Sequence, residues 1–304
     1  MNYLQALLPT FLLIFTGLAL RHQQWVKTPA WKRIESLTYF VLLPLLLFSG
    51  LARANFQALE NTSQLALAIF FAICLMGLFL LLIRPLCRVD GPAFSSVYQG
   101  SIRPNIYIAI SVATSLYGEQ GVILASLIIA VMLPLGNVLS VLVLGYFADE
   151  DRSIGKTLRA LVTNPIIIAC ALGMGFNLAA IPLSSTLLDG FAYLGQAALP
   201  LGLMAVGAGL KLNTGDQWHH YTVMFTSGFK LLLFPSITAL VCYSMGLQAT
   251  ATTVAVLFTA VPCSASAYVL SGQMGGHQPL MSLIISTQTM LAVFSLPFIL
   301  WFAS

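Results

Sequence analysis

Ten apolar segments, separated by short polar stretches, follow one another along the chain. Each is close to the length of about 17–25 residues that an α-helix needs to cross a bilayer. The segments cover approximately residues 4–20, 35–52, 63–83, 94–118, 120–147, 158–178, 182–210, 221–244, 250–271 and 280–302. The pattern predicts an all-α polytopic membrane protein with ten transmembrane helices.

The fourth and the ninth of these segments each contain a proline among polar residues. Pro104 and Pro262 each remove a backbone donor and clash with the preceding turn, so neither helix can run through its proline undisturbed. Irregular backbone at membrane depth persists only where protein or a water-filled cavity surrounds it. Two such interruptions in matching halves indicate a transporter binding site. We therefore expect helices 4 and 9 to be broken where a substrate binds.

The composition agrees with a membrane protein. Hydrophobic residues make up 59% of the 304 residues and charged residues only 7%, against a usual charged share of about 25%. This excludes a soluble globular domain and a nucleic-acid-binding surface, despite the net charge of +4. The lipid bilayer is the expected environment. The five cysteines show no paired spacing and no His-Glu-x-x-His sequence occurs, so we predict no disulfide framework, metal or cofactor.

The distribution of lysine and arginine predicts the orientation. The odd-numbered connections carry Arg21, Lys27, Lys32, Arg33, Arg84, Arg88, Arg152, Lys156, Arg159 and Lys211, whereas the even-numbered connections carry only Arg53. Because basic residues are enriched in cytoplasmic loops, we expect both termini on the non-cytoplasmic side.

Two short sequences recur at the same offset. Ser126-Leu-Ile-Ile129 returns as Ser282-Leu-Ile-Ile285, and Leu43-Pro-Leu45 returns as Leu199-Pro-Leu201, each 156 residues later. The repeats therefore span about residues 1–147 and 158–304, with five helices each. An odd number of helices per repeat means that the two halves insert in opposite directions, which predicts an inverted repeat.

Several motifs resemble the auxin efflux carrier family, which includes the plant auxin exporters and bacterial permeases for organic acids. The motifs are Arg103-Pro-Asn-Ile-Tyr107, Leu133-Pro-Leu-Gly-Asn137, Asn164-Pro165, Ser266-Ala-Tyr-Val-Leu270 and Gln273-Met-Gly-Gly276. The similarity extends over essentially the whole chain and is greatest to the bacterial members. One departure is His277, where the family pattern has an acid after the paired glycines.

The resemblance implies two five-helix inverted repeats with broken fourth and ninth helices that cross at the binding site. It also implies a scaffold at about residues 1–52 and 158–210, which often mediates homodimerisation. The moving transport bundle would comprise about residues 63–147 and 221–304, and transport would be of the elevator type. The expected location is the bacterial inner (plasma) membrane.

Arg103 is the main candidate for substrate binding. Its planar guanidinium can hold a carboxylate through two parallel hydrogen bonds, and an ionisable side chain inside a membrane segment is functional by default. The alternative is that Arg103 only neutralises helix ends. Beside it, the amide of Asn105 can bridge a carboxylate and the broken backbone, while Asn137 can line the site or tie helices together.

The second proline is followed by Ser264 and Ser266, whose hydroxyls and helix N–H groups can receive an anion. Close packing of small residues is the alternative for both. Tyr107 and Tyr268 follow the two prolines at similar intervals and can stack on an organic substrate, although aromatic packing alone would explain them. Gln288, midway along the tenth helix, is a further hydrogen-bonding candidate for the substrate.

Lys230 is the second isolated cation in a membrane segment. It can bind an anion, titrate, or donate to carbonyls freed at a helix crossing. We interpret it as a structural or coupling cation.

No carboxylate falls in the middle of a predicted span. With only cations inside, the site should prefer an anion, and a potential negative inside drives an anion outward. The sequence therefore predicts a carrier, in the export direction, for small mono- or dicarboxylates or auxin-like acids. A hydrolase would depend on a Ser264–Lys230 dyad alone, so we do not expect an enzyme. A membrane sensor that binds the same ligand without transporting it remains the alternative.

Overall fold

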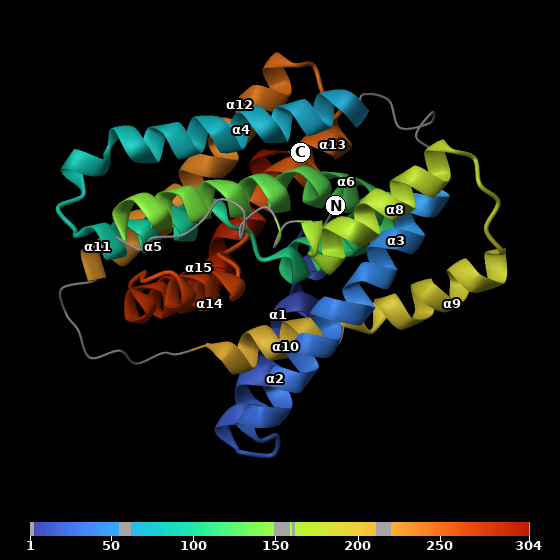
Figure 1. The fold of residues 1–304 in the computed structure, drawn as a ribbon, viewed down its shortest axis with the longest axis horizontal. Helices are drawn as coiled ribbons and strands as arrows, with labels where there is room; N and C mark the ends of the chain where they lie inside the picture. The colour runs from blue at the N-terminus through green and yellow to red at the C-terminus, as the bar shows by residue number, and fades with distance from the viewer. Residues whose placement is uncertain (1–2, 55–61, 149–158, 160–161, 211–219, 304) are drawn as a thin grey trace. The chain divides into compact units, whose positions relative to one another are not determined.

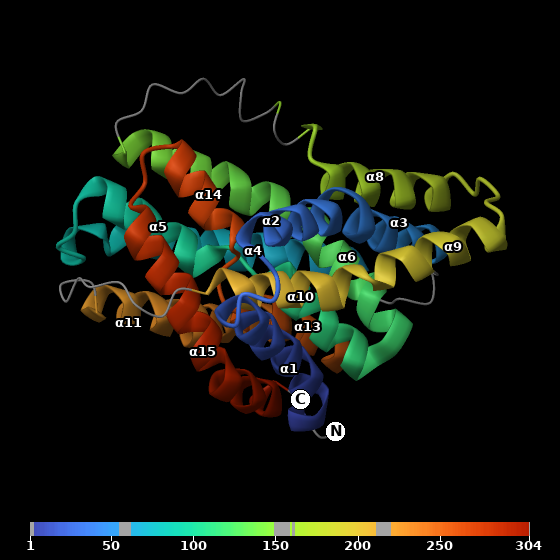
Figure 2. The same ribbon diagram turned by 90° about the horizontal axis from the view of Figure 1, so that it is seen from below.

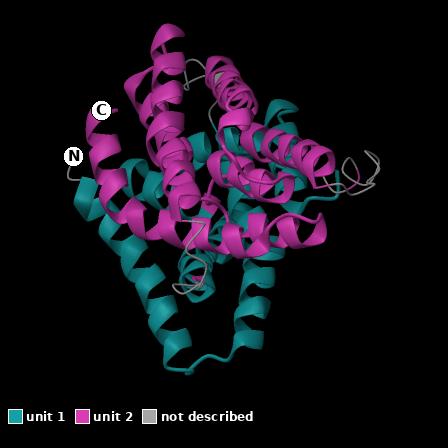
Figure 3. Cartoon of the chain, turned by 90° about the vertical axis from the view of Figure 1, so that its left-hand side faces the viewer, with its two compact units in different colours: residues 1–62, 107–130, 160–209 teal, residues 63–106, 131–159, 210–304 magenta. Residues whose placement is uncertain are grey.

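The computed structural model describes residues 3–54, 62–148, 159, 162–210 and 220–303. These residues form helices and no strand, and their single isolated β-bridge joins Pro104 and Cys263. The chain divides into two compact units, which are described separately (Figure 3). Unit 1 comprises residues 1–62, 107–130 and 160–209, and unit 2 comprises residues 63–106, 131–159 and 210–304.

The helices follow the apolar segments of the sequence. The first half contains α1 (Tyr3–His22), α2 (Thr28–Leu37), the π-helix η1 (Thr38–Leu42), α3 (Leu43–Arg53), α4 (Thr62–Leu82), the 3-10 helix η2 (Arg84–Leu86), α5 (Gly91–Ile102) and α6 (Ile106–Phe147). The second half contains α8 (Pro165–Leu178), α9 (Ser185–Gln196), α10 (Ala198–Gly209), α11 (His220–Gly228), the π-helix η4 (Phe229–Leu233), α12 (Phe234–Ser244), α13 (Ala249–Ala260), α14 (Ser266–Gln273) and α15 (Gln278–Phe302).

Within the described residues, seven helical runs are long and apolar enough to cross a membrane. They are Tyr3–His22, Thr28–Arg53, Ser63–Leu82, Ile106–Phe147, Ser185–Gly209, His220–Ser244 and Gln278–Phe302. The protein is therefore a multi-pass membrane protein. Three predicted segments have no separate run of this length. The break at Pro104 leaves α5 with 12 residues, and the rest of the fourth segment is part of Ile106–Phe147. The break at Pro262 leaves α13 and α14 with 12 and 8 residues, and the described part of the sixth segment is α8, with 14 residues.

Residue Gly118 marks the boundary predicted between the fourth and fifth segments. It interrupts α6 with φ +56° and ψ −132°. Because this conformation is strained for any residue with a Cβ, the glycine permits a sharp turn between two helical stretches of α6.

Helices of unit 1 pack closely against one another. The helix α3 packs between α8 and α9, and both views of the ribbon show this arrangement (Figure 1, Figure 2). The ring of Phe48 on α3 meets Phe176 of α8 and Phe191 of α9 edge-on, with ring centroids 6.0 and 5.9 Å away. These edge-to-face contacts are the favourable geometry for aromatic pairs.

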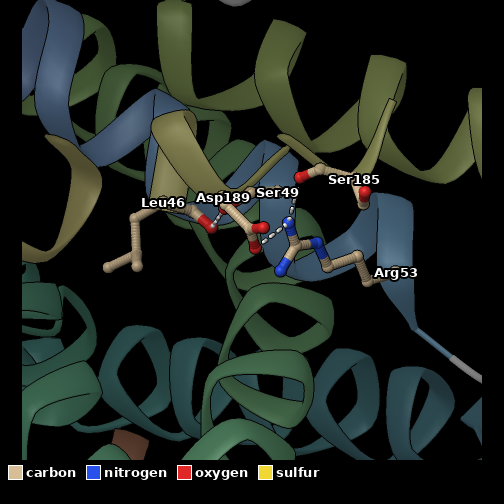
Figure 4. Close-up of polar contacts among 5 residues, drawn as sticks. All are labelled: Leu46, Ser49, Arg53, Ser185 and Asp189. Atoms are coloured by element: carbon tan, nitrogen blue, oxygen red, sulfur yellow. Dashed lines mark hydrogen bonds and ion pairs between the residues drawn. The ribbon is translucent and has the colours of Figure 1, made fainter. Parts of the chain in front are cut away.

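The predicted positive-inside pattern had one exception, Arg53, and unit 1 shows how its charge is compensated. Arg53 Nη2 lies 2.7 Å from Asp189 Oδ1 on α9 and also donates to the carbonyl of Ser185 at 3.2 Å (Figure 4). The arginine and the aspartate thus partly cancel each other's charge at this end of α3.

The Asn164-Pro165 motif forms the start of α8. Asn164 Oδ1 accepts hydrogen bonds from the backbone N–H groups of Ile166 and Ile167, and its Nδ2 donates to Tyr39 Oη at 2.9 Å. The proline lies in the first turn, where no backbone N–H is needed. The motif therefore both caps α8 and connects it to η1.

Candidate functional site

The two predicted interruptions meet each other in unit 2. The first break, residues 103–105, follows α5, and the second break, residues 261–265, follows α13. Pro104 and Cys263 form an antiparallel bridge, and Asn105 N donates to the carbonyl of Pro262 at 2.8 Å. We call this meeting point the crossing. Backbone groups that the prolines remove from helical bonding thus find partners in the opposite break, as a membrane interior demands.

Gln288 on α15 completes the bonding of the crossing. Its Oε1 accepts from Cys263 N at 2.8 Å, and its Nε2 donates to the carbonyls of Gly100 at 3.1 Å and Thr226 at 3.4 Å. The side chain is fully buried. The sequence predicted that Gln288 bonds to the substrate. In the structure it bonds instead to the backbone of three other segments, so we assign it a positioning role.

Arg103 connects the first break to the start of α14. Its side chain is 7% exposed, Nη2 donates to Ser266 Oγ at 3.1 Å, and Nη1 lies 3.5 Å from Gln99 Oε1. Gln99 is itself held, because its Nε2 donates to Ser271 Oγ at 3.1 Å. Two neutral oxygen acceptors, Ser266 Oγ and Gln99 Oε1, therefore lie beside the guanidinium.

The hydroxyls of the second break lie beside this guanidinium. Ser264 Oγ and Ser266 Oγ are 2.9 Å apart, and Ser266 N donates to Ser264 Oγ at 3.3 Å. Both residues are half-buried and stand where α14 begins. The N-terminal end of a helix carries partial positive charge, so the arginine, the hydroxyls and the helix start all favour an anion.

The other candidates occupy different places. Asn105 is 2% exposed in the first break, and Tyr268 is half-buried on α14 against the apolar cluster around Cys263. Asn137 is half-buried on α6. Tyr107 belongs to unit 1, where its Oη donates to Thr38 Oγ1 at 3.3 Å and its ring packs against Gly202.

Lys230 is fully buried in η4, with its Nζ 5.0 Å from the centroid of the Phe234 ring. No described residue accepts a hydrogen bond from this ammonium. Unit 2 thus contains two buried cations near the crossing, of which only Arg103 has hydrogen-bonding partners among the residues shown.

The structure also identifies residues that the sequence interpretation missed. Gln99, Ser271 and Thr226 support Arg103 or Gln288 and were not among the candidates. Gln99 carried a signal: it precedes Arg103 by four residues, which places both on one helix face. His277, the departure from the family pattern, caps α15, because its Nδ1 accepts from Leu280 N at 3.1 Å.

Histidine, cysteine, aspartate and glutamate do not gather in groups of three or more anywhere in the described ranges. The donor set at the crossing is one of hydroxyls, amides and a guanidinium.

Comparisons with known proteins found two matches. The family described as membrane transport protein matches residues 150–300. A protein named as an uncharacterized transporter, from Methanothermobacter thermautotrophicus, is 25% identical over 269 residues, which cover 86% of this chain and 84% of that protein.

The apolar helices and these matches define a membrane transport protein and not an enzyme. These matches are consistent with the auxin efflux carrier family, which the motifs of the sequence resemble.

Proposed function

We propose that this protein is a secondary carrier of small organic anions, with the carboxylate bound at the crossing. The observation that supports this most strongly is the position of Arg103, an almost completely buried cation hydrogen-bonded to Ser266 at the start of α14. The guanidinium is always charged, and its planar fork matches the geometry of a carboxylate. A carboxylate can bind it in bidentate fashion while Ser264 and Asn105 complete the site.

The charges of unit 2 favour an anionic substrate. Among its described residues the single carboxylate is that of Asp90, which caps α5 by accepting from Ala93 N at 2.8 Å. Arg103 and Lys230 both lie near Cys263 in the second break. A substrate cation would be repelled by the permanent charge of Arg103 there, whereas an organic anion would be attracted.

The proposed mechanism is an elevator in which unit 2 moves against unit 1. Support comes from the division of the chain into two compact units, with the crossing inside one of them. In this proposal unit 1 is the scaffold, through which two copies associate, and unit 2 is the transport bundle. Unit 1 also contains residues 107–130, which the family resemblance assigned to the bundle.

The number of membrane helices, their repeats and their orientation are also proposals. We propose ten transmembrane helices in two inverted repeats, with both termini outside the cytoplasm of a bacterial inner membrane. The matching offsets of the repeated sequences and the similar position of the two breaks support it. A membrane potential that is negative inside the cell then favours outward movement of any anion that moves without a compensating cation.

Thermal stabilisation of the purified protein tests the anion site. Lactate, malonate and phenylacetate serve as mono-, di- and aromatic carboxylate probes for the wild type, for Arg103→Ala and for Arg53→Ala. A ligand that binds the native state raises the melting temperature. We expect one probe class to stabilise the wild type and Arg53→Ala, but not Arg103→Ala. No stabilisation by any probe, or equal stabilisation of all three proteins, would contradict the proposal.

Binding alone does not distinguish a carrier from a sensor. The probe that stabilises the protein is therefore loaded, radiolabelled, into proteoliposomes. Flux that requires the wild-type protein supports a carrier, and binding without flux contradicts it.

A further inference from the structure

Two buried polar side chains at the junction of α11 and η4 have no hydrogen-bonding partner among the described residues. They are Lys230 Nζ and Ser227 Oγ, in residues that are 0% and 2% exposed. The two residues are three positions apart in the sequence. Buried polar groups are almost always bonded, so an exception this deep needs an explanation.

The described helices that pack against Lys230 supply no countercharge. The π-helix η4 packs against α5, α11, α12, α13 and α15, and the ring of Phe229 lies 5.6 Å from Phe79 of α4. None of these six helices contains Asp or Glu. Their titratable side chains are those of Cys74, Tyr98, His220, Tyr221, Cys242 and Tyr243, and the breaks add Arg103 and Cys263.

Lys230 and the anion site are both close to the second break. Both Lys230 and Arg103 are close enough to Cys263 for their charges to act on its thiol. Gln288 provides a further connection, because its amide bonds to Cys263 and to Thr226, the residue before Ser227. An anion held by Arg103 would therefore sit within electrostatic range of Lys230, separated from it by low-dielectric protein.

A buried charge without a partner is strongly destabilising. With the anion site empty, a protonated Lys230 would add a second positive charge near that of Arg103. With a carboxylate bound, that carboxylate supplies the missing countercharge, and protonation becomes favourable. Anion binding and proton binding are then linked, and the linkage is reciprocal.

We propose that Lys230 takes up one proton when an organic anion binds at the crossing and releases it when the anion leaves, so that the carrier moves the anion together with a proton. This inference rests on the proposed anion site. The proton comes from water on the side open to the site, converts the neutral amine to the ammonium, and returns to water on the other side. For a monocarboxylate the pair carries no net charge, so its movement would follow the pH gradient and not the membrane potential.

Calorimetric titration with phenylacetate or lactate tests the linkage. Both probes are fully ionised above about pH 6, since carboxyl groups of this kind have pKa values near 4. Titrations in Pipes and in Tris, which release different heats on ionisation, give the number of protons taken up per anion. We expect about one proton for the wild type. We also expect the affinity to fall about tenfold for each unit of rising pH while the free lysine is neutral.

Two substitutions and a control separate Lys230 from other groups. Lys230→Met should bind the anion with no proton uptake. Lys230→Arg keeps a permanent charge and should also bind without uptake, which covers the case in which the methionine variant does not fold. Lys32→Met, an exposed lysine of unit 1, should behave as the wild type.

The outcomes distinguish the inference from the function on which it rests. Anion binding without proton uptake in the wild type, or unchanged uptake in the Lys230 variants, would overturn the role of Lys230 and leave the carrier proposal intact. If lactate, malonate and phenylacetate all fail to bind the wild type, the proposal of an anion site at the crossing is contradicted. The proposed proton uptake by Lys230 is then contradicted as well.

Discussion

Gln288 Oε1 accepts a hydrogen bond of 2.8 Å from Cys263 N, and this contact joins α15 to the irregular backbone after α13. The same amide donates to the carbonyl of Gly100, in the last turns of α5. One buried side chain thus supports both broken helices at the point where they cross. A neutral amide suits this task, because it offers an acceptor on one side and two donors on the other.

Removing this amide should destabilise unit 2. Gln288→Ala leaves Cys263 N and the two carbonyls without their partner, and we expect a loss of about 2–3 kcal/mol from unsatisfied buried groups. Thr287→Ala, at the half-buried neighbouring position, should cost less than about 1 kcal/mol. Reversible unfolding in detergent measures both values. Equal stabilities of the two variants would contradict the positioning role of Gln288.

A carboxylate placed beside Arg103 should compete with the substrate. Gln99→Glu puts a negative charge at the atom that now lies 3.5 Å from Nη1 of Arg103. An internal ion pair then compensates the guanidinium, and we expect anion affinity to fall more than about tenfold. The protein should remain folded, since the change preserves the shape of the side chain.

The control for this prediction makes the same chemical change elsewhere. Gln248→Glu alters an exposed residue before α13, and its anion affinity should match the wild type. If both glutamate variants lost affinity equally, the effect would come from net charge and not from the contact with Arg103.

Helices α1 and α10 approach each other too closely for side chains at Gly17 and Gly207. A Cβ on Gly207 would overlap the backbone carbonyl of Ile14, whereas a Cβ on Gly209 would have nothing within 4 Å. Gly207→Ala should therefore lower the melting temperature, with a cost of about 1–3 kcal/mol from overpacking. Gly209→Ala tests the effect of an added methyl group alone and should leave the melting temperature nearly unchanged. A loss in both variants would point to helix flexibility and not to close packing.

Cys87, between α4 and α5, is the one cysteine outside the helices and the two breaks. Burial raises the pKa of its thiol, and the charge of Arg84 opposes this rise. Since the thiolate is the reactive form, labelling by a maleimide should be slow near neutral pH and accelerate as the pH rises.

The same thiol tests the proposed orientation. An impermeant maleimide added outside intact cells should not label Cys87 if the connection is cytoplasmic, and permeabilised cells should become labelled. A Cys87→Ala variant controls for the other thiols. Labelling of intact cells at the permeabilised rate would reverse the assignment of sides.

Much of the fold could be predicted from local sequence. Long apolar segments define the helices of a membrane protein because the bilayer requires about 20 apolar residues per crossing. Pro104 and Pro262 end α5 and α13 within two residues of where the sequence predicted interruptions, because the effect of proline on a helix is covalent and local. The motifs around these prolines were enough to indicate the family.

Other features depended on which segments meet in space. The family resemblance implied that the two broken helices cross, but no local pattern indicated which backbone groups would pair or that Gln288 would bond to the second break. The two tyrosines that follow the breaks looked equivalent in the sequence, yet Tyr107 bonds to Thr38 in unit 1 while Tyr268 belongs to unit 2.

The sequence by itself determined the class of protein, the approximate helices and the two interruptions, because hydrophobic length and proline geometry act within a single segment. The tertiary structure alone decided how the freed backbone groups are satisfied and which acceptors contact Arg103. It also decided that Lys230 is buried with no acceptor among the described residues. Hydrogen-bond partners at a crossing come from residues far apart in the chain, and their choice depends on packing that periodicity does not encode.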